Sequence, residues 1–235
     1  MENYEQNEKS TIMDYMADLF FDPSSLAERI IKKPKVLLPL ILSTLLVVAA
    51  ILIVKNMAVE HLVSSMKGVK ELEMLSPEQI KEMMSSQYGI GVALSAIYPL
   101  AAVYIGGGIY YLLGKIFKSQ ALYKEIVSLI AFAFIITAIG TLVTSIIQIL
   151  TNNITFDLSL AALAQRNLYE PPKWYYSLLT LINPFTIWCY TVIVIGLSKL
   201  GNISRSSATV IVLIFIAIAQ AVAILNAFLS ASKMM

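Results

Sequence analysis

The sequence predicts an all-α membrane protein, a five-span transmembrane helix bundle with an N-terminal interfacial helix and an amphipathic helical outer loop. Two observations support this fold class. First, the 235-residue chain is 58% hydrophobic and 14% charged, whereas a soluble domain is about 25% charged. Second, five apolar stretches follow one another along the chain, and each is long enough, as a helix, to cross a hydrocarbon core of roughly 30 Å.

Residues 1–35 are expected to form a cytoplasmic tail and the interfacial helix. A short capped helix is predicted before Pro23, and a second helix from Leu26 to Lys32 with Ser24 or Ser25 as its N-cap. The second helix places Leu26, Ile30 and Ile31 on one face and basic side chains on the other, which is typical of a helix in the membrane interface. The alternative is a flexible tether whose lysines only set the topology.

The first span is predicted at residues 36–54, directly after a cluster of lysines. The polar segment 56–87 that follows has apolar residues at helical spacing. Within it, Ser76-Pro77-Glu78-Gln79 combines an N-cap Ser with Pro at the first helical position and Gln at the third. We therefore expect two amphipathic helices in this outer loop, lying on the far membrane surface or against other loops.

The remaining spans are predicted at residues 88–113, 126–150, 178–197 and 208–230, so that the membrane domain covers residues 36–230. Breaks at Tyr98-Pro99 and Asn183-Pro184 interrupt the second and fourth spans. These breaks are either packing kinks or the broken helices of a solute pathway.

Basic residues indicate which side of the membrane each segment occupies. The flank before the first span and the turns 114–125 and 198–207 are rich in Lys and Arg, whereas loops 56–87 and 151–177 together hold five basic and seven acidic residues. The positive-inside rule then predicts a multi-pass protein of the cell membrane with a cytoplasmic N-terminus and an extracellular C-terminus. No signal-peptide pattern begins the sequence, so the first span is expected to act as the insertion signal.

The composition argues against enzyme activity and against a bound metal or cofactor. One Cys, Cys189, and one His, His61, are too few for a Cys- or His-based metal cluster. No nucleotide-binding or zinc motif is present, and the net charge of +2 offers no basic field to nucleic acid. The spans also lack charged side chains in their cores, which argues against an ion-coupled carrier.

Small and helix-breaking residues within the spans predict where helices pack or kink. Small side chains let transmembrane helices approach closely. Three alanines that repeat every four residues in the last span therefore predict a tight helix contact, either an internal packing seam, which a small bundle needs first, or a contact with a partner. The complete set of packing or kink candidates is Pro99, Gly106, Gly107, Gly108, Pro184, Trp188, Gly196, Ala219, Ala223 and Ala227.

Two motifs frame the membrane domain. The first is Phe20-Phe21-Asp22-Pro23, followed by an amphipathic helix and by Pro34 before the first span. The second is Asn183-Pro184-Phe185-Thr186-Ile187-Trp188, then Ile195-Gly196-Leu197 and Ser206-Ser207-Ala208. With the five-span layout, these motifs resemble the Yip family, whose eukaryotic members interact with Ypt/Rab GTPases. The acidic-Leu-Tyr-Gly-Pro stretch of the eukaryotic branch is absent, so the resemblance is to the bacterial branch.

The resemblance implies a non-enzymatic interaction, assembly or accessory factor, because some bacterial members resemble accessory subunits of ABC-type efflux transporters. Its partners would be membrane lipids and other integral membrane proteins, such as ABC permease and adaptor subunits. The partner-interface candidates are apolar residues of the N-terminal helices and of the outer loop: Phe20, Phe21, Leu26, Ile30, Leu62 and Met66. The alternative function is a small-solute permease that uses the broken second and fourth spans.

Overall fold

The protein, seen in a computed structural model, is a bundle of long helices. The structure describes residues 11–65, 75–163 and 174–232, and these residues contain helices and no strand. The helices are α1 (Ile12–Phe21), α2 (Pro23–Lys32), α3 (Leu37–Ile53), α4 (Lys55–Ser65), α5 (Pro77–Ile116), α6 (Tyr123–Thr151), η2 (Leu160–Leu163), α7 (Trp174–Thr180), α8 (Pro184–Gly201) and α9 (Arg205–Ser232).

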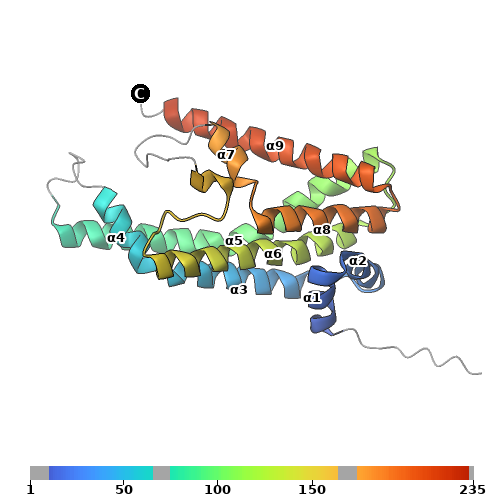
Figure 1. Ribbon diagram of the computed structural model, residues 1–235, viewed down its shortest axis with the longest axis horizontal. Helices are drawn as coiled ribbons and strands as arrows, with labels where there is room; N and C mark the ends of the chain where they lie inside the picture. The colour runs from blue at the N-terminus through green and yellow to red at the C-terminus, as the bar shows by residue number, and fades with distance from the viewer. Residues whose placement is uncertain (1–10, 66–74, 164–173, 233–235) are drawn as a thin grey trace, which may run out of the picture.

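The long helices run along one common axis, so the bundle has two distinct ends (Figure 1). One end holds α1, α2 and the turns 117–122 and 202–204, and we call it the basic end. The other end holds α4, the first turns of α5 and the segment 152–163, and we call it the hairpin end.

Four helices are long and apolar enough to cross a membrane: Pro77–Ile116, Tyr123–Thr151, Pro184–Gly201 and Arg205–Asn226. A fifth candidate span is α3 together with α4, a pair that bends by 52° at its break. The prediction of an all-α membrane protein is therefore confirmed, with four or five candidate spans in the described part of the chain.

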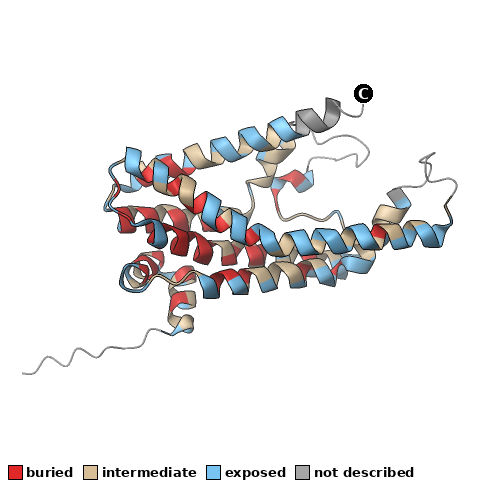
Figure 2. Ribbon diagram, turned by 180° about the vertical axis from the view of Figure 1, so that it is seen from behind, coloured by how far each residue is buried: buried red, intermediate tan, exposed pale blue. Residues whose placement is uncertain are grey.

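Helix α6 forms the centre of the bundle. It packs against α3, α5 and α8, and 67% of its most apolar window is buried, against 17% for α5 and for α9. Every side chain from Ile126 to Ile136 except Phe134 is buried. Figure 2 shows the buried residues gathered toward the basic end, while α5 and α9 expose much of their length.

Local capping chemistry explains where several helices begin. Thr11 and Asp14 form a capping box at the start of α1, and Ser76 and Gln79 form one at the start of α5. The N-cap of α2 is Asp22 rather than the predicted serine, because its carboxylate accepts hydrogen bonds from two following backbone N–H groups at 3.2 Å.

The outer loop departs from prediction in one respect. Its first helix is α4, but its second helix does not end before the second span, since the two form one helix of 40 residues, α5. Val59 of α4 and Met84 of α5 are buried, and α4 packs against α5. The Tyr88 hydroxyl donates to the Ile51 carbonyl at 2.7 Å, which ties this region of α5 to α3.

The fourth span also departs from prediction. It was expected at residues 178–197 with a break at Asn183-Pro184, but that dipeptide is the start of α8. The Asn183 side-chain oxygen accepts from the Phe185 N–H at 2.9 Å, and Pro184 fits the first helical position because its missing N–H is not needed there. Residues 174–180 form a separate short helix, α7.

Helix α2 lies at the basic end with its apolar side toward the bundle. Leu26, Ala27 and Ile30 are fully buried, and α2 packs against α6 and α8. The face that the sequence pattern assigned to the membrane interface is therefore covered by protein. Ile31, at 46% exposed, is the apolar residue of the predicted face that stays accessible.

Candidate functional site

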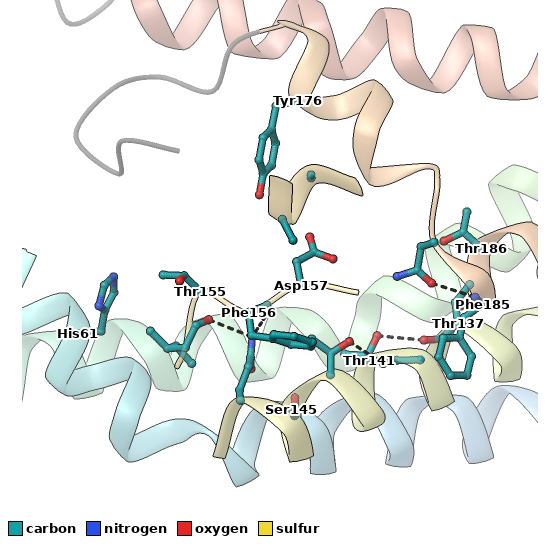
Figure 3. A pocket seen from close by; sticks show the side chains of 17 residues that line it. His61, Thr137, Thr141, Ser145, Thr155, Phe156, Asp157, Tyr176, Phe185 and Thr186 are labelled. Carbon is teal, nitrogen blue, oxygen red and sulfur yellow. Dashed lines mark hydrogen bonds between the residues drawn. The ribbon is translucent and has the colours of Figure 1, made fainter. Parts of the chain in front are cut away.

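A polar cavity of about 780 Å³ opens at the hairpin end of the bundle. The second half of α6 forms its floor, and the segment 154–162 and the first turn of α8 form its walls (Figure 3). His61 of α4 and Tyr176 of α7 complete the lining. Five separate chain segments thus contribute to one site.

The floor of the cavity is a polar stripe on an otherwise apolar helix. Its members recur every three or four residues along α6, with Thr144 and Ser145 adjacent, so they share one broad helical face. They are Thr137, Thr141, Thr144, Ser145 and Gln148. The threonine hydroxyls donate to carbonyls of their own helix, at 2.8 Å for Thr137, 3.0 Å for Thr141 and 2.9 Å for Thr144. These bonds let a membrane helix hold hydroxyl groups without leaving their hydrogens unpaired.

Hydrogen bonds from α6 hold the wall segment over the stripe. The Gln148 amide nitrogen donates to the carbonyls of Ile154 and Phe156, both at 3.0 Å. Asn152, in the left-handed conformation with φ 49°, ends α6. After it the chain turns back over α6 as the wall segment. Farther along, the Leu160 N–H donates to the Ile182 carbonyl at 3.1 Å, which joins the wall segment to the residues before α8.

Gly140 allows α8 to approach α6 at the edge of the cavity. A Cβ at this position would lie 2.7 Å from Cγ of Phe185 and 2.8 Å from its Cβ. No side chain larger than hydrogen fits beside this ring without a shift. The phenyl ring therefore closes the cavity on the side of the buried core.

The charge in the lining comes from one carboxylate. Among the described residues that line the cavity, Asp157 carries a formal charge at neutral pH and the others do not. Its Oδ1 accepts from the Ser159 N–H at 2.8 Å, which fixes the carboxyl group. The described residues contain no group of three or more His, Cys, Asp or Glu side chains suited to a metal ion.

The glycines predicted to mediate packing behave differently from one another. A Cβ on Gly107 would lie 2.9 Å from Cγ2 of Val127, and one on Gly196 would lie 2.4 Å from Cδ1 of Leu129. Gly106 is buried against Phe215 at an ordinary 3.7 Å. Gly108 has open space around it, so the prediction of a packing contact is wrong there.

The remaining packing candidates fall in three environments. Pro99 is buried inside α5, and Trp188 is half-buried against the core. Ala219 is exposed and Ala223 is half-buried, so the prediction of an internal seam is wrong at Ala219. The side chain of Ala227 lies outside the described residues.

The partner-interface candidates are also divided. Leu26 and Ile30 belong to the core, so they are not available to a partner. Phe21 is 88% exposed and Phe20 is half-buried. Leu62 is half-buried on α4, and Met66 lies outside the described residues. The accessible part of the N-terminal candidate surface is therefore the phenylalanine pair.

Ion pairs hold the N-terminal helices on the basic end. Arg29 pairs with Asp18 between α2 and α1, and Lys199 of α8 pairs with Glu28 at 2.8 Å. The hydrogen bond and charge of Lys199 lower the pKa of Glu28, and the bonds from Ser25 lower the pKa of Asp22. The Ser128 hydroxyl, on α6, donates to the Lys35 carbonyl at 2.7 Å. This bond ties the segment after α2 to the central helix.

The polar cavity was not predicted from the sequence, although a signal for it exists. Gln148 is a polar residue within the predicted span 126–150, and the hydroxyl residues at positions 137, 141, 144 and 145 lie on the same face of the same span. What the sequence lacks is any indication that the segment 154–162 folds back over this face.

Comparison with known proteins agrees with this architecture. The Yip1 domain matches residues 17–226. The chain is 29% identical over 199 residues to "Membrane protein YknW" of Bacillus subtilis (strain 168), an alignment that covers 83% of this chain and 82% of that protein. No solved structure matches the chain. The protein is therefore a member of the Yip1 domain family and an integral membrane protein.

Proposed function

We propose that the protein is a non-enzymatic accessory or assembly factor that binds another integral membrane protein. The resemblance to accessory subunits of ABC-type efflux systems makes a permease or adaptor subunit the expected partner. The observation that supports this role best lies on α9. The side-chain oxygen of Gln220 is buried and accepts no hydrogen bond from the described residues, although Gln220 lies in a candidate span.

The surroundings of Gln220 favour a protein partner over lipid. Lipid tails offer no hydrogen-bond donor, whereas an amide between transmembrane helices contributes about 0.6–2 kcal/mol. Gln220 as a whole is half-buried, and the neighbouring Ala219 is exposed. The small side chain of Ala219 lets a second helix approach α9 closely beside Gln220.

The proposed topology follows the positive-inside rule. The membrane domain covers residues 36–230 with five spans, the basic end lies in the cytoplasm, and the hairpin end and the C-terminus lie outside. Partner subunits in the membrane would then contact α9, while cytoplasmic ones would contact Phe20 and Phe21.

Co-purification from native membranes in mild detergent tests the proposal. We expect Ala219→Leu to reduce the recovered partner at least fivefold, because a bulky side chain separates the helices. The matched control is Ala221→Leu, on the same helix, also exposed, and about 200° around the axis from Ala219. Equal recovery with both variants, or a protein that always purifies alone, would refute the proposal.

A small-solute permease is the second candidate, and the polar cavity is the observation that favours it. The cavity ends where the buried block Ile126–Ile136 begins, so passage would require that block to open. Flux measurements in reconstituted liposomes test this function. The double variant Pro99→Ala with Pro184→Ala should abolish flux if the breaks form a pathway, and unchanged flux would leave them as structural features.

A further inference from the structure

The polar cavity presents hydrogen-bond acceptors to whatever occupies it. The hydroxyl hydrogens of Thr137, Thr141 and Thr144 are used within α6. A hydroxyl oxygen that donates once still has lone pairs to offer, and these three side chains line the cavity. The floor therefore suits a group that donates several hydrogen bonds.

The charge of the cavity selects the sign of the occupant. Asp157 forms no ion pair with any basic side chain in the described ranges. In Figure 3 its carboxylate lies between Tyr176 on one side and the threonine stripe on the other. A partly enclosed carboxylate favours a cation, because desolvation strengthens the attraction between the two charges.

The aromatic rings and the volume of the cavity further restrict the chemical class of the occupant. Phe156, Phe185 and Tyr176 line the same space, and aromatic faces attract organic cations. The volume of about 780 Å³ falls in the range of small-molecule sites, roughly 300–1,000 Å³. A hard metal ion would require more carboxylate or carbonyl ligands than the one charged group provides.

We propose that this cavity binds a primary ammonium group, with Asp157 as its counter-ion and the Thr137–Thr144 hydroxyls as its acceptors. The N–H bonds distinguish this class from a quaternary ammonium, which cannot donate to the stripe. Two sources share the chemistry, a free small amine and the ethanolamine headgroup of a lipid. The inference is independent of the accessory role, since it concerns another face of the molecule.

Calorimetric titration of the full-length protein in detergent tests the inference. Ethanolammonium chloride is the probe, and we expect saturable binding. Choline, which keeps the charge but lacks N–H donors, should bind at least tenfold more weakly, and ethylene glycol, which lacks the charge, should not bind. Ethanolamine binding that is absent, or matched by ethylene glycol, would overturn the inference and leave a water-filled cavity.

Two variants and two matched controls locate the binding. Asp157→Asn should weaken ethanolamine binding at least tenfold, and Thr141→Val with Thr144→Val should weaken it several-fold. Glu60→Gln removes an exposed carboxylate at the same end, and Thr191→Val removes a hydroxyl with the same bonding, to the Ile187 carbonyl at 2.8 Å. Neither control should change the affinity, and equal losses in controls and variants would overturn the assignment.

A titration in lipid nanodiscs distinguishes a free amine from the ethanolamine headgroup of a lipid. The protein is placed in nanodiscs of phosphatidylcholine alone or with phosphatidylethanolamine, and the ethanolamine titration is repeated. Weaker apparent binding with phosphatidylethanolamine identifies the headgroup as the occupant, and unchanged binding identifies a free amine. Because the threonine variant leaves the charge and the loop in place, it keeps the test decisive if Asp157→Asn fails to fold.

Discussion

At the scale of single residues, Gly196 lies against the side chain of Leu129 with no room for a Cβ. A Cβ there would lie 2.4 Å and 2.6 Å from the two δ-carbons of Leu129, which is fully buried. Gly196→Ala should therefore destabilise the protein by about 1–3 kcal/mol, the usual cost of overpacking. The measurement is the apparent melting temperature of the purified protein in detergent, which should fall by several degrees.

The glycine triplet of α5, residues 106–108, supplies the control for that prediction. Gly108 is also in a helix interior but meets nothing within 4 Å, so Gly108→Ala should leave stability unchanged or raise it slightly, because Ala is the better helix former. Shortening the obstructing side chain with Leu129→Ala should remove most of the penalty of Gly196→Ala. An equal penalty in both backgrounds would contradict the contact as its cause.

Single-residue roles were the least predictable from sequence, and the glycine triplet shows why. Successive helical residues point about 100° apart, so Gly106, Gly107 and Gly108 face Phe215, Val127 and open space in turn. Composition alone marks all three as packing residues. Which of them meets a neighbour depends on the rotation of α5 against α6 and α9, which is a property of the assembled bundle.

At the scale of elements, the attachment of α2 to α8 should depend on pH. The pKa of Glu28 lies below the ordinary value of 4.5 because Lys199 donates a hydrogen bond to the carboxylate. A lowered pKa in the folded state means that the pair stabilises the fold above pH 4.5 and that this contribution is lost as pH falls through the lowered pKa. Wild type should therefore melt above Glu28→Gln at pH 7.

The difference should be small, since both side chains are about half exposed and solvent screens the pair. It should disappear in melting curves recorded well below pH 4. Lys199→Gln should lower the melting temperature at pH 7 by a similar amount, and combining the two changes should add little. A difference that persists unchanged in acid would show that Glu28 acts through packing and not through charge.

The hairpin of α4 and α5 offers a second test at this scale. Val59 is 3% exposed, whereas Leu62 is half-buried on the same helix. Leu62→Asp should reduce co-purification of a partner while the protein still inserts and purifies, if this face forms part of an interface. Val59→Asp should instead lower the yield of folded protein, because it places a charge between α4 and α5. The same loss of yield with Leu62→Asp would assign Leu62 to the fold.

The presence of each long helix could be predicted because the hydropathy pattern that indicates it is local. The exact start of a helix could be predicted only where the sequence contains a capping motif. The capping boxes at Thr11 and Ser76 show this. The continuity of α5 could not be predicted, because its polar and apolar halves look like separate elements, and Gly89 and Gly91 stand where the two halves meet although no proline does. At Asn183-Pro184 the error was the reverse: the sequence predicted a kink within one span, but a new helix starts there. The same dipeptide is compatible with both a kink and a helix start.

At the scale of the whole molecule, hydropathy was enough to predict the class of fold, and no local pattern was enough to predict the cavity. Long apolar stretches must become helices in a membrane because their backbone groups have no other partners there. The cavity instead requires α4, α6, α7, α8 and the segment 154–162 to meet. Such a meeting depends on long-range packing, which single-sequence periodicity does not report.

The structure gathers basic side chains from distant parts of the chain at one end of the bundle. The contact of Glu28 with Lys199, and the bond from the Gln120 N–H to the Gly201 carbonyl at 3.0 Å, bring α2 and two inter-helix turns together. The basic residues at this end are Arg29, Lys32, Lys33, Lys35, Lys115, Lys118, Lys124, Lys199 and Arg205. This distribution supports a cytoplasmic basic end.

Cysteine labelling tests that orientation, because the native Cys189 is buried and provides an unreactive background. Ser64→Cys places an accessible thiol at the hairpin end, and Ser206→Cys places one at the basic end, since both serines are exposed. In intact cells a membrane-impermeant maleimide should label Ser64→Cys and not Ser206→Cys. After permeabilisation both variants should react, while the wild type stays unlabelled. The reverse pattern in intact cells would invert the topology and place the amine-binding cavity on the cytoplasmic side.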